Sequence, residues 1–138
     1  MKQPKGFKSL RPDIDAWKLT GNIYGLKQAA KVWYDEISDK LLHIGYQRSS
    51  EPCLFWRRVQ GKLVLLSVYV DDLLIACSSQ SVIGQIVQEL EKHYKLKRLG
   101  PLSWYLGAHV IQNQGTFVVD QEQYIDVVLK RFHMEGCQ

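Results

Sequence analysis

Two adjacent aspartates, Asp71 and Asp72, interrupt the most apolar stretch of the 138-residue chain. Residues 63–70 precede them and residues 73–77 follow, and both runs have the composition of buried strands. The chain must therefore reverse direction at the aspartates, beside the core. Two carboxylates about 4 Å apart repel by roughly 4 kcal/mol at an effective dielectric near 20. A bound Mg²⁺ would offset this repulsion, and the alternative is an exposed turn that uses Asp for its backbone preferences.

The apolar run before the aspartates is nearly unbroken, so residues 62–70 are predicted to form a central strand that is covered on both faces. Another apolar run lies at residues 53–59, and Gln60-Gly61 between the two runs is typical of a short hairpin turn. Residues 104–111 and 116–119 are predicted to form a second strand pair. Its turn is expected at residues 113–115.

Three stretches carry apolar residues at helical spacing. Residues 28–44 form the first, with Gly45 as the predicted C-cap, and residues 81–94 form the second. The third, residues 124–132, follows Asp120 and Gln123, which resemble a capping box. The order helix, hairpin, helix, hairpin, helix predicts an α+β fold, with helices packed on an antiparallel sheet.

Length and composition predict a single compact domain with a folded core, since 46% of the residues are hydrophobic and 23% are charged. Disordered and fibrous classes are excluded. No membrane span is expected, because Ser67 and the two aspartates interrupt the longest apolar run, and no signal-peptide core is expected, because residues 2–5 are Lys, Gln, Pro and Lys. Three widely spaced cysteines favour a reduced intracellular compartment; they are Cys53, Cys77 and Cys137.

The formal net charge of +4 is compatible with a polyanionic partner but does not demand one. Basic residues gather at residues 2–11, at Arg57-Arg58 and at residues 92–98, between apolar or aromatic stretches. This interleaving suits a surface that follows a phosphate backbone. The alternative is a set of ordinary solvated faces.

The motif Tyr69-Val70-Asp71-Asp72 resembles the palm signature of reverse transcriptases, and other segments resemble the copia-type branch from LTR retrotransposons. These segments occur in order and at the family's spacing along the whole chain. They are residues 1–7, 24–29, 33–34, 53–55, 99–100, 105–107 and 121–134.

This resemblance implies an RNA-directed DNA polymerase fragment from a Pol polyprotein, built as a partial palm with a remnant of the fingers. Asp71, as the main ligand, and Asp72 would hold two Mg²⁺ ions, which activate the primer 3′-hydroxyl and stabilise the leaving pyrophosphate. Tyr69 and Val70 would line the floor beneath the primer terminus.

The resemblance also implies contacts with an RNA or DNA template, its primer and a dNTP. The template and nucleotide segment would be Tyr24, Gly25, Leu26, Lys27 and Gln28; the primer grip would be Trp104, Tyr105, Leu106 and Gly107; the candidate general acids are Lys97 and Lys95. Each also has a simpler reading: a surface lysine for Lys27, an aromatic hairpin packed on the palm for Trp104 and Tyr105, and a solvated helix end for Lys95 and Lys97. Trp33 and Tyr34 are assigned to the core by their helical spacing.

By the same resemblance, residues 1–27 are a fingers remnant and loop, residues 28–112 the palm with the primer-grip hairpin, and residues 113–138 the connection to the thumb. An upstream polyprotein fragment is an expected partner. The family implies a cytoplasmic, particle-associated or nuclear location and no membrane.

The resemblance breaks at one catalytic position. In the family a further aspartate precedes the segment that matches residues 1–7, whereas Asp13 and Asp15 follow it in a loop flanked by proline. The isolated chain is therefore expected to have little or no polymerase activity and to leave one sheet edge unpaired. Local departures from the family pattern occur at Gly21-Asn22, Ala30, Glu51, Arg98 and His109.

Two other functions remain open from the sequence. One is a nucleic-acid-binding module that keeps the basic surface without the chemistry. The other is a protein-interaction remnant of a retrotransposon, which would bind neither Mg²⁺ nor nucleic acid.

Overall fold

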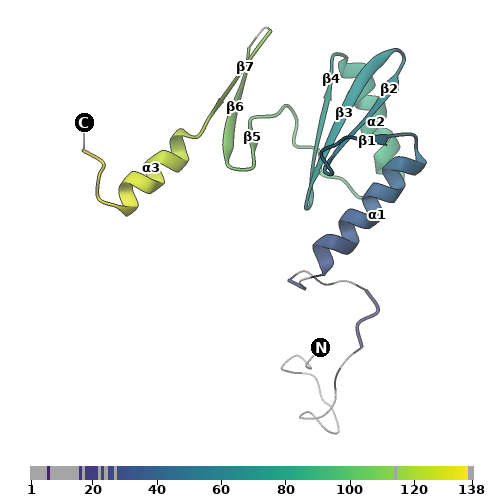
Figure 1. The fold of residues 1–138 in the computed structure, drawn as a ribbon, viewed down its shortest axis with the longest axis horizontal. Helices are drawn as coiled ribbons and strands as arrows, with labels where there is room; N and C mark the ends of the chain where they lie inside the picture. The colour runs from purple at the N-terminus through teal and green to yellow at the C-terminus, as the bar shows by residue number, and fades with distance from the viewer. Residues whose placement is uncertain are drawn as a thin grey trace. The chain divides into compact units, whose positions relative to one another are not determined.

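The computed structural model describes residues 6, 16, 18–21, 23, 25–26, 28–113 and 115–136. Within these residues it contains three α-helices and two antiparallel sheets, which confirms the predicted α+β class (Figure 1). The chain divides into two compact units, Met1–His93 and Tyr94–Gln138, where length alone predicted one. The predicted functional division at residues 27 and 112 stays a prediction. No helix in the described part of the chain is long and apolar enough to cross a membrane.

The first unit contains a four-stranded sheet in the order β1-β2-β3-β4 and two helices. Its elements are α1 (Ala29–His43), β1 (Gln47–Arg48), β2 (Leu54–Val59), β3 (Lys62–Tyr69), β4 (Asp72–Cys77) and α2 (Gln80–Glu91). The predicted hairpin is confirmed, since β2 and β3 are antiparallel neighbours on either side of Gln60-Gly61, where both residues have positive φ. The short strand β1 was not predicted.

Strand β3 is central in this sheet, as predicted, but the described residues of its unit cover it on one face only. Val64, Leu66 and Val68 are fully buried on that face. On the opposite face Leu63 is 43% exposed and Tyr69 is 51% exposed. The prediction of a strand covered on both faces is therefore wrong for this unit, because an apolar run does not by itself show how many faces are packed.

Helices α1 and α2 supply the other half of the core. Helix α2 lies across one face of the sheet (Figure 1), and its buried residues recur every four positions, as predicted. Helix α1 ends in a Schellman motif in which Ile44 is the C-cap and Gly45, with φ of 91°, is the residue after it. Among the residues described in this unit, the buried ones are Ile37, Ser38, Leu41, Tyr46, Phe55, Val64, Leu66, Val68, Val82, Ile86 and Leu90.

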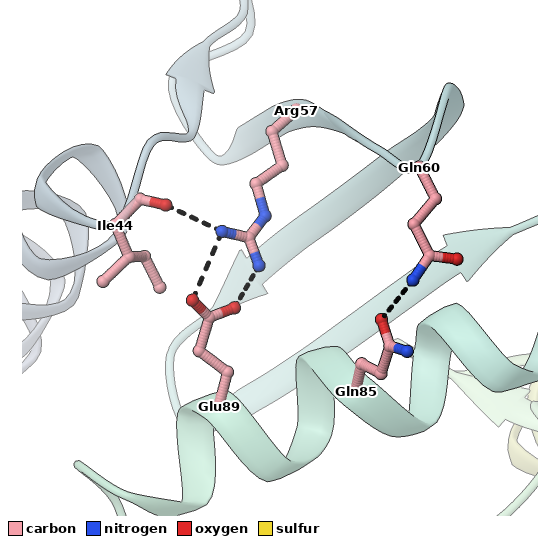
Figure 2. A network of polar contacts seen from close by, with 5 residues as sticks. All are labelled: Ile44, Arg57, Gln60, Gln85 and Glu89. Carbon is pink, nitrogen blue, oxygen red and sulfur yellow. Dashed lines mark hydrogen bonds and ion pairs between the residues drawn. The ribbon is translucent and has the colours of Figure 1, made fainter.

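Arg57 joins the sheet to both helices (Figure 2). Its Nη1 donates to the Ile44 carbonyl at 2.7 Å and to Glu89 Oε1 on α2 at 3.4 Å, and its Nη2 pairs with the other Glu89 oxygen. The guanidinium also lies over the Tyr46 ring, 4.5 Å from the centroid. The sequence left Arg57 open between a phosphate-binding surface and an ordinary solvated face, and neither fits, because only 14% of its side chain is exposed.

Burial also acts on the tyrosine beneath Arg57. Loss of solvation raises the pKa of the Tyr46 hydroxyl above its ordinary value, while the positive charge of Arg57 opposes part of that rise. Gln60 at the β2-β3 turn donates to Gln85 Oε1 on α2 at 3.2 Å, so this turn is held as well (Figure 2).

The second unit contains a three-stranded sheet, in the order β5-β6-β7, and one helix. Its elements are β5 (Trp104–Tyr105), β6 (Ala108–Asn113), β7 (Thr116–Asp120) and α3 (Glu122–Arg131). The single strand predicted at residues 104–111 is wrong. Leu106 and Gly107, both with positive φ, form a two-residue turn between β5 and β6.

The predicted capping box is also wrong, although the predicted helix is present as α3. Asp120 ends β7, and the N-cap is Gln121, which makes no side-chain capping hydrogen bond. Asp120 instead accepts from the backbone N–H of Glu122 at 3.4 Å and contacts His109 on the neighbouring strand. A short polar residue just before a helix is typical of an N-cap, but Asp120 instead belongs to the sheet.

Candidate active site

The aspartates lie at the tip of the β3-β4 hairpin. Tyr69 at the end of β3 is the cross-strand partner of Asp72 at the start of β4, so Val70 and Asp71 form a two-residue turn between them. Both aspartates are exposed to solvent. The predicted chain reversal at this motif is confirmed.

The turn has an unusual backbone conformation. Val70 has φ of 49°, in the left-handed region that β-branched residues rarely adopt. A two-residue hairpin needs positive φ at this position, and Gly, Asn or Asp usually supply it. Holding a non-glycine residue there costs of order 1–3 kcal/mol and persists only when the surrounding structure enforces it.

Trp33 of α1 contacts this turn. Its indole Nε1 donates a hydrogen bond to the Val70 carbonyl at 2.6 Å, across 37 residues of sequence. The sequence assigned Trp33 to the core, whereas the side chain is half-buried and its polar edge reaches the hairpin tip. The signal that could have revealed this role is chemical, because a partly buried indole N–H needs an acceptor.

The neighbouring Tyr34 fixes the same part of α1. Its hydroxyl donates to the Pro52 carbonyl in the loop before β2. The Arg48 guanidinium lies 5.9 Å from the Tyr34 ring centroid and 5.7 Å from that of the buried Phe55. Tyr34 therefore has a structural role, but like Trp33 it is half-buried and lies at the edge of the core to which it was assigned.

Asp71 and Asp72 have the donor chemistry of a Mg²⁺ site. Mg²⁺ prefers hard oxygen ligands and is commonly held by one or two carboxylates together with water and substrate phosphates. Among the described residues, no group of three or more His, Cys, Asp or Glu side chains could hold a metal ion. Metal binding by the two aspartates therefore stays a prediction, and Asp13 and Asp15 lie outside the described residues.

The predicted template and nucleotide segment immediately precedes α1. Gly25 has φ of 90°, Leu26 accepts a hydrogen bond from the Ala29 backbone N–H at 3.0 Å, and Gln28 is the N-cap residue. Gly25 is therefore required by its backbone conformation, whatever it contacts. Tyr24 and Lys27 lie outside the described residues. The nucleic-acid contacts of this segment stay a prediction.

The predicted primer grip forms a hairpin in the second unit. The Trp104 ring stacks on His109, with centroids 4.7 Å apart and planes inclined by 25°. His109 Nδ1 lies 3.1 Å from Asp120 Oδ2, so three strands contribute to this cluster. Leu106 and Gly107 are exposed at the turn. The geometry suits a surface hairpin, and its role in holding a primer stays a prediction.

The two candidate general acids, Lys95 and Lys97, are exposed in the irregular segment between α2 and β5. They belong to the second unit, whereas the aspartate turn belongs to the first. The structure thus groups residues 69–72 at one tip and residues 104–107 at another, and the role of the lysines stays a prediction.

Comparison with protein families adds independent evidence. The model of the reverse transcriptase (RNA-dependent DNA polymerase) family matches residues 1–138. The transposon Ty5-1 protein of Saccharomyces cerevisiae is 37% identical over 91% of this chain, which covers 41% of that protein. The retrovirus-related Pol polyprotein from transposon TNT 1-94 of Nicotiana tabacum is 32% identical over the whole chain, and that from transposon RE1 of Arabidopsis thaliana is 32% identical over 97% of it.

The chain spans less than half of the Ty5-1 protein, 11% of the tobacco polyprotein and 9% of the Arabidopsis polyprotein. No solved structure matches it. The family is one that uses divalent metal and acts on a nucleic-acid template. With the aspartate turn between two core strands and a family match along its full length, the chain belongs to the reverse transcriptase (RNA-dependent DNA polymerase) family, in its copia-type branch.

Proposed function

We propose that this chain supplies the metal-binding turn and part of the palm of an RNA-directed DNA polymerase, as a segment of a longer Pol polyprotein. The observation that carries the proposal is the exposed pair Asp71 and Asp72 at the tip of a hairpin in which β4 pairs along its length with β3, and β3 contributes three buried residues to the core. Rigid strands hold the two carboxylates together, while their exposure leaves the metal's other positions to water and phosphate oxygens.

In the complete enzyme, two Mg²⁺ ions would activate the primer 3′-hydroxyl and neutralise charge on the leaving pyrophosphate. Asp71 and Asp72 would bind these ions, with Asp71 as the main ligand. Tyr69, 51% exposed next to the turn, would contact the primer terminus. Because two carboxylates alone make an incomplete two-metal site, the isolated chain should bind metal weakly and synthesise little or no DNA.

Metal binding at the turn can be tested by NMR with Mn²⁺, which broadens signals close to its site. We expect broadening that is strongest at residues 69–73 in the wild-type protein and decreases with distance from the turn, and we expect its loss in Asp71→Ala and Asp72→Ala. Asp35→Ala is the matched control, because Asp35 is an exposed carboxylate on α1 that pairs with Lys31. Broadening that is absent, or equally strong in Asp71→Ala, would rule out a metal site at this turn.

Nucleic-acid binding and synthesis need a separate experiment with an RNA/DNA primer-template duplex. We expect binding that weakens steeply as salt rises, since phosphate contacts release counterions, and no primer extension in Mg²⁺. Mg²⁺-dependent extension that vanishes in Asp71→Ala would show that the isolated chain is a sufficient polymerase. Absence of any salt-sensitive binding would favour a protein-interaction role.

A further inference from the structure

We infer that Trp33 is a positioning residue for the aspartate turn, and that its indole N–H enforces the left-handed conformation of Val70. The Trp33 hydrogen bond at 2.6 Å and the positive φ of Val70 meet at the same residue, because rotation about the Val70 N–Cα bond turns the carbonyl that Trp33 binds. The link to metal binding rests on the proposed function, whereas the link to backbone conformation does not.

The geometry explains why a bond to this carbonyl matters. The Val70 carbonyl belongs to the peptide plane that joins Val70 to Asp71, so its direction determines how the backbone enters Asp71. A β-branched residue left alone would move this plane to relieve its positive φ. Indole has a single N–H donor and no acceptor, so Trp33 can bond to this peptide only when the Val70 carbonyl points toward it. The hydrogen bond therefore favours one orientation of the plane.

Trp33 can act as a fixed donor because α1 is anchored. Ile37 lies four residues further along the same helix face and is fully buried, as is Leu41 after it. Tyr34 adds a second tether through the Pro52 carbonyl. The position of α1 is therefore fixed by its buried residues and does not change with the conformation of the turn. Through the Trp33 hydrogen bond, this fixed helix restrains the Val70 carbonyl at the hairpin tip.

The test compares Trp33→Phe with Trp56→Phe, because both remove one indole N–H from the first unit and keep an aromatic ring. Trp56 lies on β2, and the described residues include no hydrogen bond from it to the turn. Amide hydrogen exchange is measured by NMR in metal-free protein. We expect Trp33→Phe to speed exchange at residues 69–72 by about tenfold relative to the β3 amides, and Trp56→Phe to leave that ratio unchanged.

Val70→Gly tests whether the bond acts against strain. Glycine adopts positive φ without steric cost, so the turn should keep its shape without help from Trp33. We expect Trp33→Phe to speed turn exchange by less than about threefold in the Val70→Gly background. An equal effect in both backgrounds, or no effect specific to the turn in the wild-type background, overturns the inference. Dividing the exchange rate of the turn amides by that of the β3 amides cancels any change in the global stability of the unit.

Mn²⁺ broadening separates this inference from the proposed function. If neither wild type nor Trp33→Phe binds Mn²⁺ but the turn exchanges faster in the variant, Trp33 positions the turn and the proposed metal function fails. If both bind, we expect weaker broadening at residues 69–73 in Trp33→Phe than in Trp56→Phe. Equal broadening from a loosened turn would overturn the role of Trp33 in positioning the metal ligands.

Discussion

The two units of this chain use apolar residues in opposite ways. In the first unit, apolar side chains from two helices and one sheet face meet in a closed core. In the second unit, Val110 is the only described hydrophobic residue classed as buried, while a dozen large apolar side chains are exposed; they are Leu99, Trp104, Leu106, Ile111, Phe117, Val118, Val119, Tyr124, Ile125, Val127, Phe132 and Met134. Similar composition is therefore associated with a buried apolar core in the first unit and with mostly exposed apolar side chains in the second.

The difference shows what a sheet needs in order to be stable alone. Cross-strand hydrogen bonds are present in both units, and the second unit adds the stack of Trp104 on His109. A hairpin without apolar burial is marginal in water, because backbone hydrogen bonds to water compete equally well. We conclude that the first unit carries the stability of the chain, and the following experiments test that conclusion.

A matched pair of phenylalanines should give the largest contrast. Phe55→Ala removes a fully buried ring from the first unit and should destabilise it by about 3–5 kcal/mol. Phe117→Ala removes a ring that is 70% exposed in the second unit and should change stability by no more than about 0.5 kcal/mol. Urea denaturation followed by circular dichroism measures both. Comparable losses would show that the second unit also contributes a packed core.

Hydrogen exchange in the intact wild-type chain should separate the units next. The β3 amides at residues 64–68 should exchange only through global unfolding of their unit. Amides of β6 and β7 should exchange roughly 100-fold faster, through local opening. Equal protection of the amides in both units would contradict a difference in stability, since it would require the two units to unfold as one cooperative structure.

Polar side-chain pairs offer a smaller contrast of the same kind. Arg57→Ala leaves Glu89 without its half-buried partner and should cost about 1–3 kcal/mol, because both charges are partly desolvated. His109→Ala breaks the more exposed pair with Asp120 and should cost about 0.2–1 kcal/mol. A double-mutant cycle with Glu89→Ala measures the coupling directly. Coupling near zero at Arg57 would contradict the network described above.

Tyrosine substitutions should have the smallest effect, which appears only at high pH. The pKa of Tyr46 is raised in the folded state, so its contribution to stability is complete below the ordinary tyrosine value and is lost as pH rises through the folded-state pKa. Tyr46→Phe should flatten this alkaline loss and change stability at pH 7 by less than about 1 kcal/mol. Tyr124→Phe, at a 62% exposed position of the second unit, is the control. An unchanged alkaline slope in Tyr46→Phe would contradict the burial of its hydroxyl.

Elements defined by local pattern were predictable from the sequence. Residues 28–44 and 81–94 have helical spacing and form α1 and α2, which end within three residues of the predicted limits. The Gln60-Gly61 turn was predictable because a glycine there permits positive φ between two apolar runs. The reversal at Asp71 and Asp72 was predictable because charged residues rarely continue a buried strand.

Features that depend on distant partners were not predictable. Arg57 carries no local mark of burial, since its partner Glu89 lies 32 residues further along the chain. The apolar pattern missed the Leu106-Gly107 turn because Leu106 continues an apolar run, although the family resemblance implied a hairpin at residues 104–107, and the structure shows the positive φ of Leu106. The contact from Trp33 to Val70 spans 37 residues and links a helix to a turn. Sequence thus identified the carboxylates of the candidate site, and the structure identified what holds them.

The Arg57 network also bears on how long the first unit stays folded. Its contacts join residues 13 and 32 positions apart, so they can form only after β2 has met the end of α1 and α2 has docked. Contacts completed after the folding barrier slow unfolding and leave the folding rate almost unchanged. The Arg57 contacts should therefore slow unfolding of the first unit. Removing Arg57 should raise the unfolding rate, and with it the rate at which proteases that capture the opened chain degrade the protein.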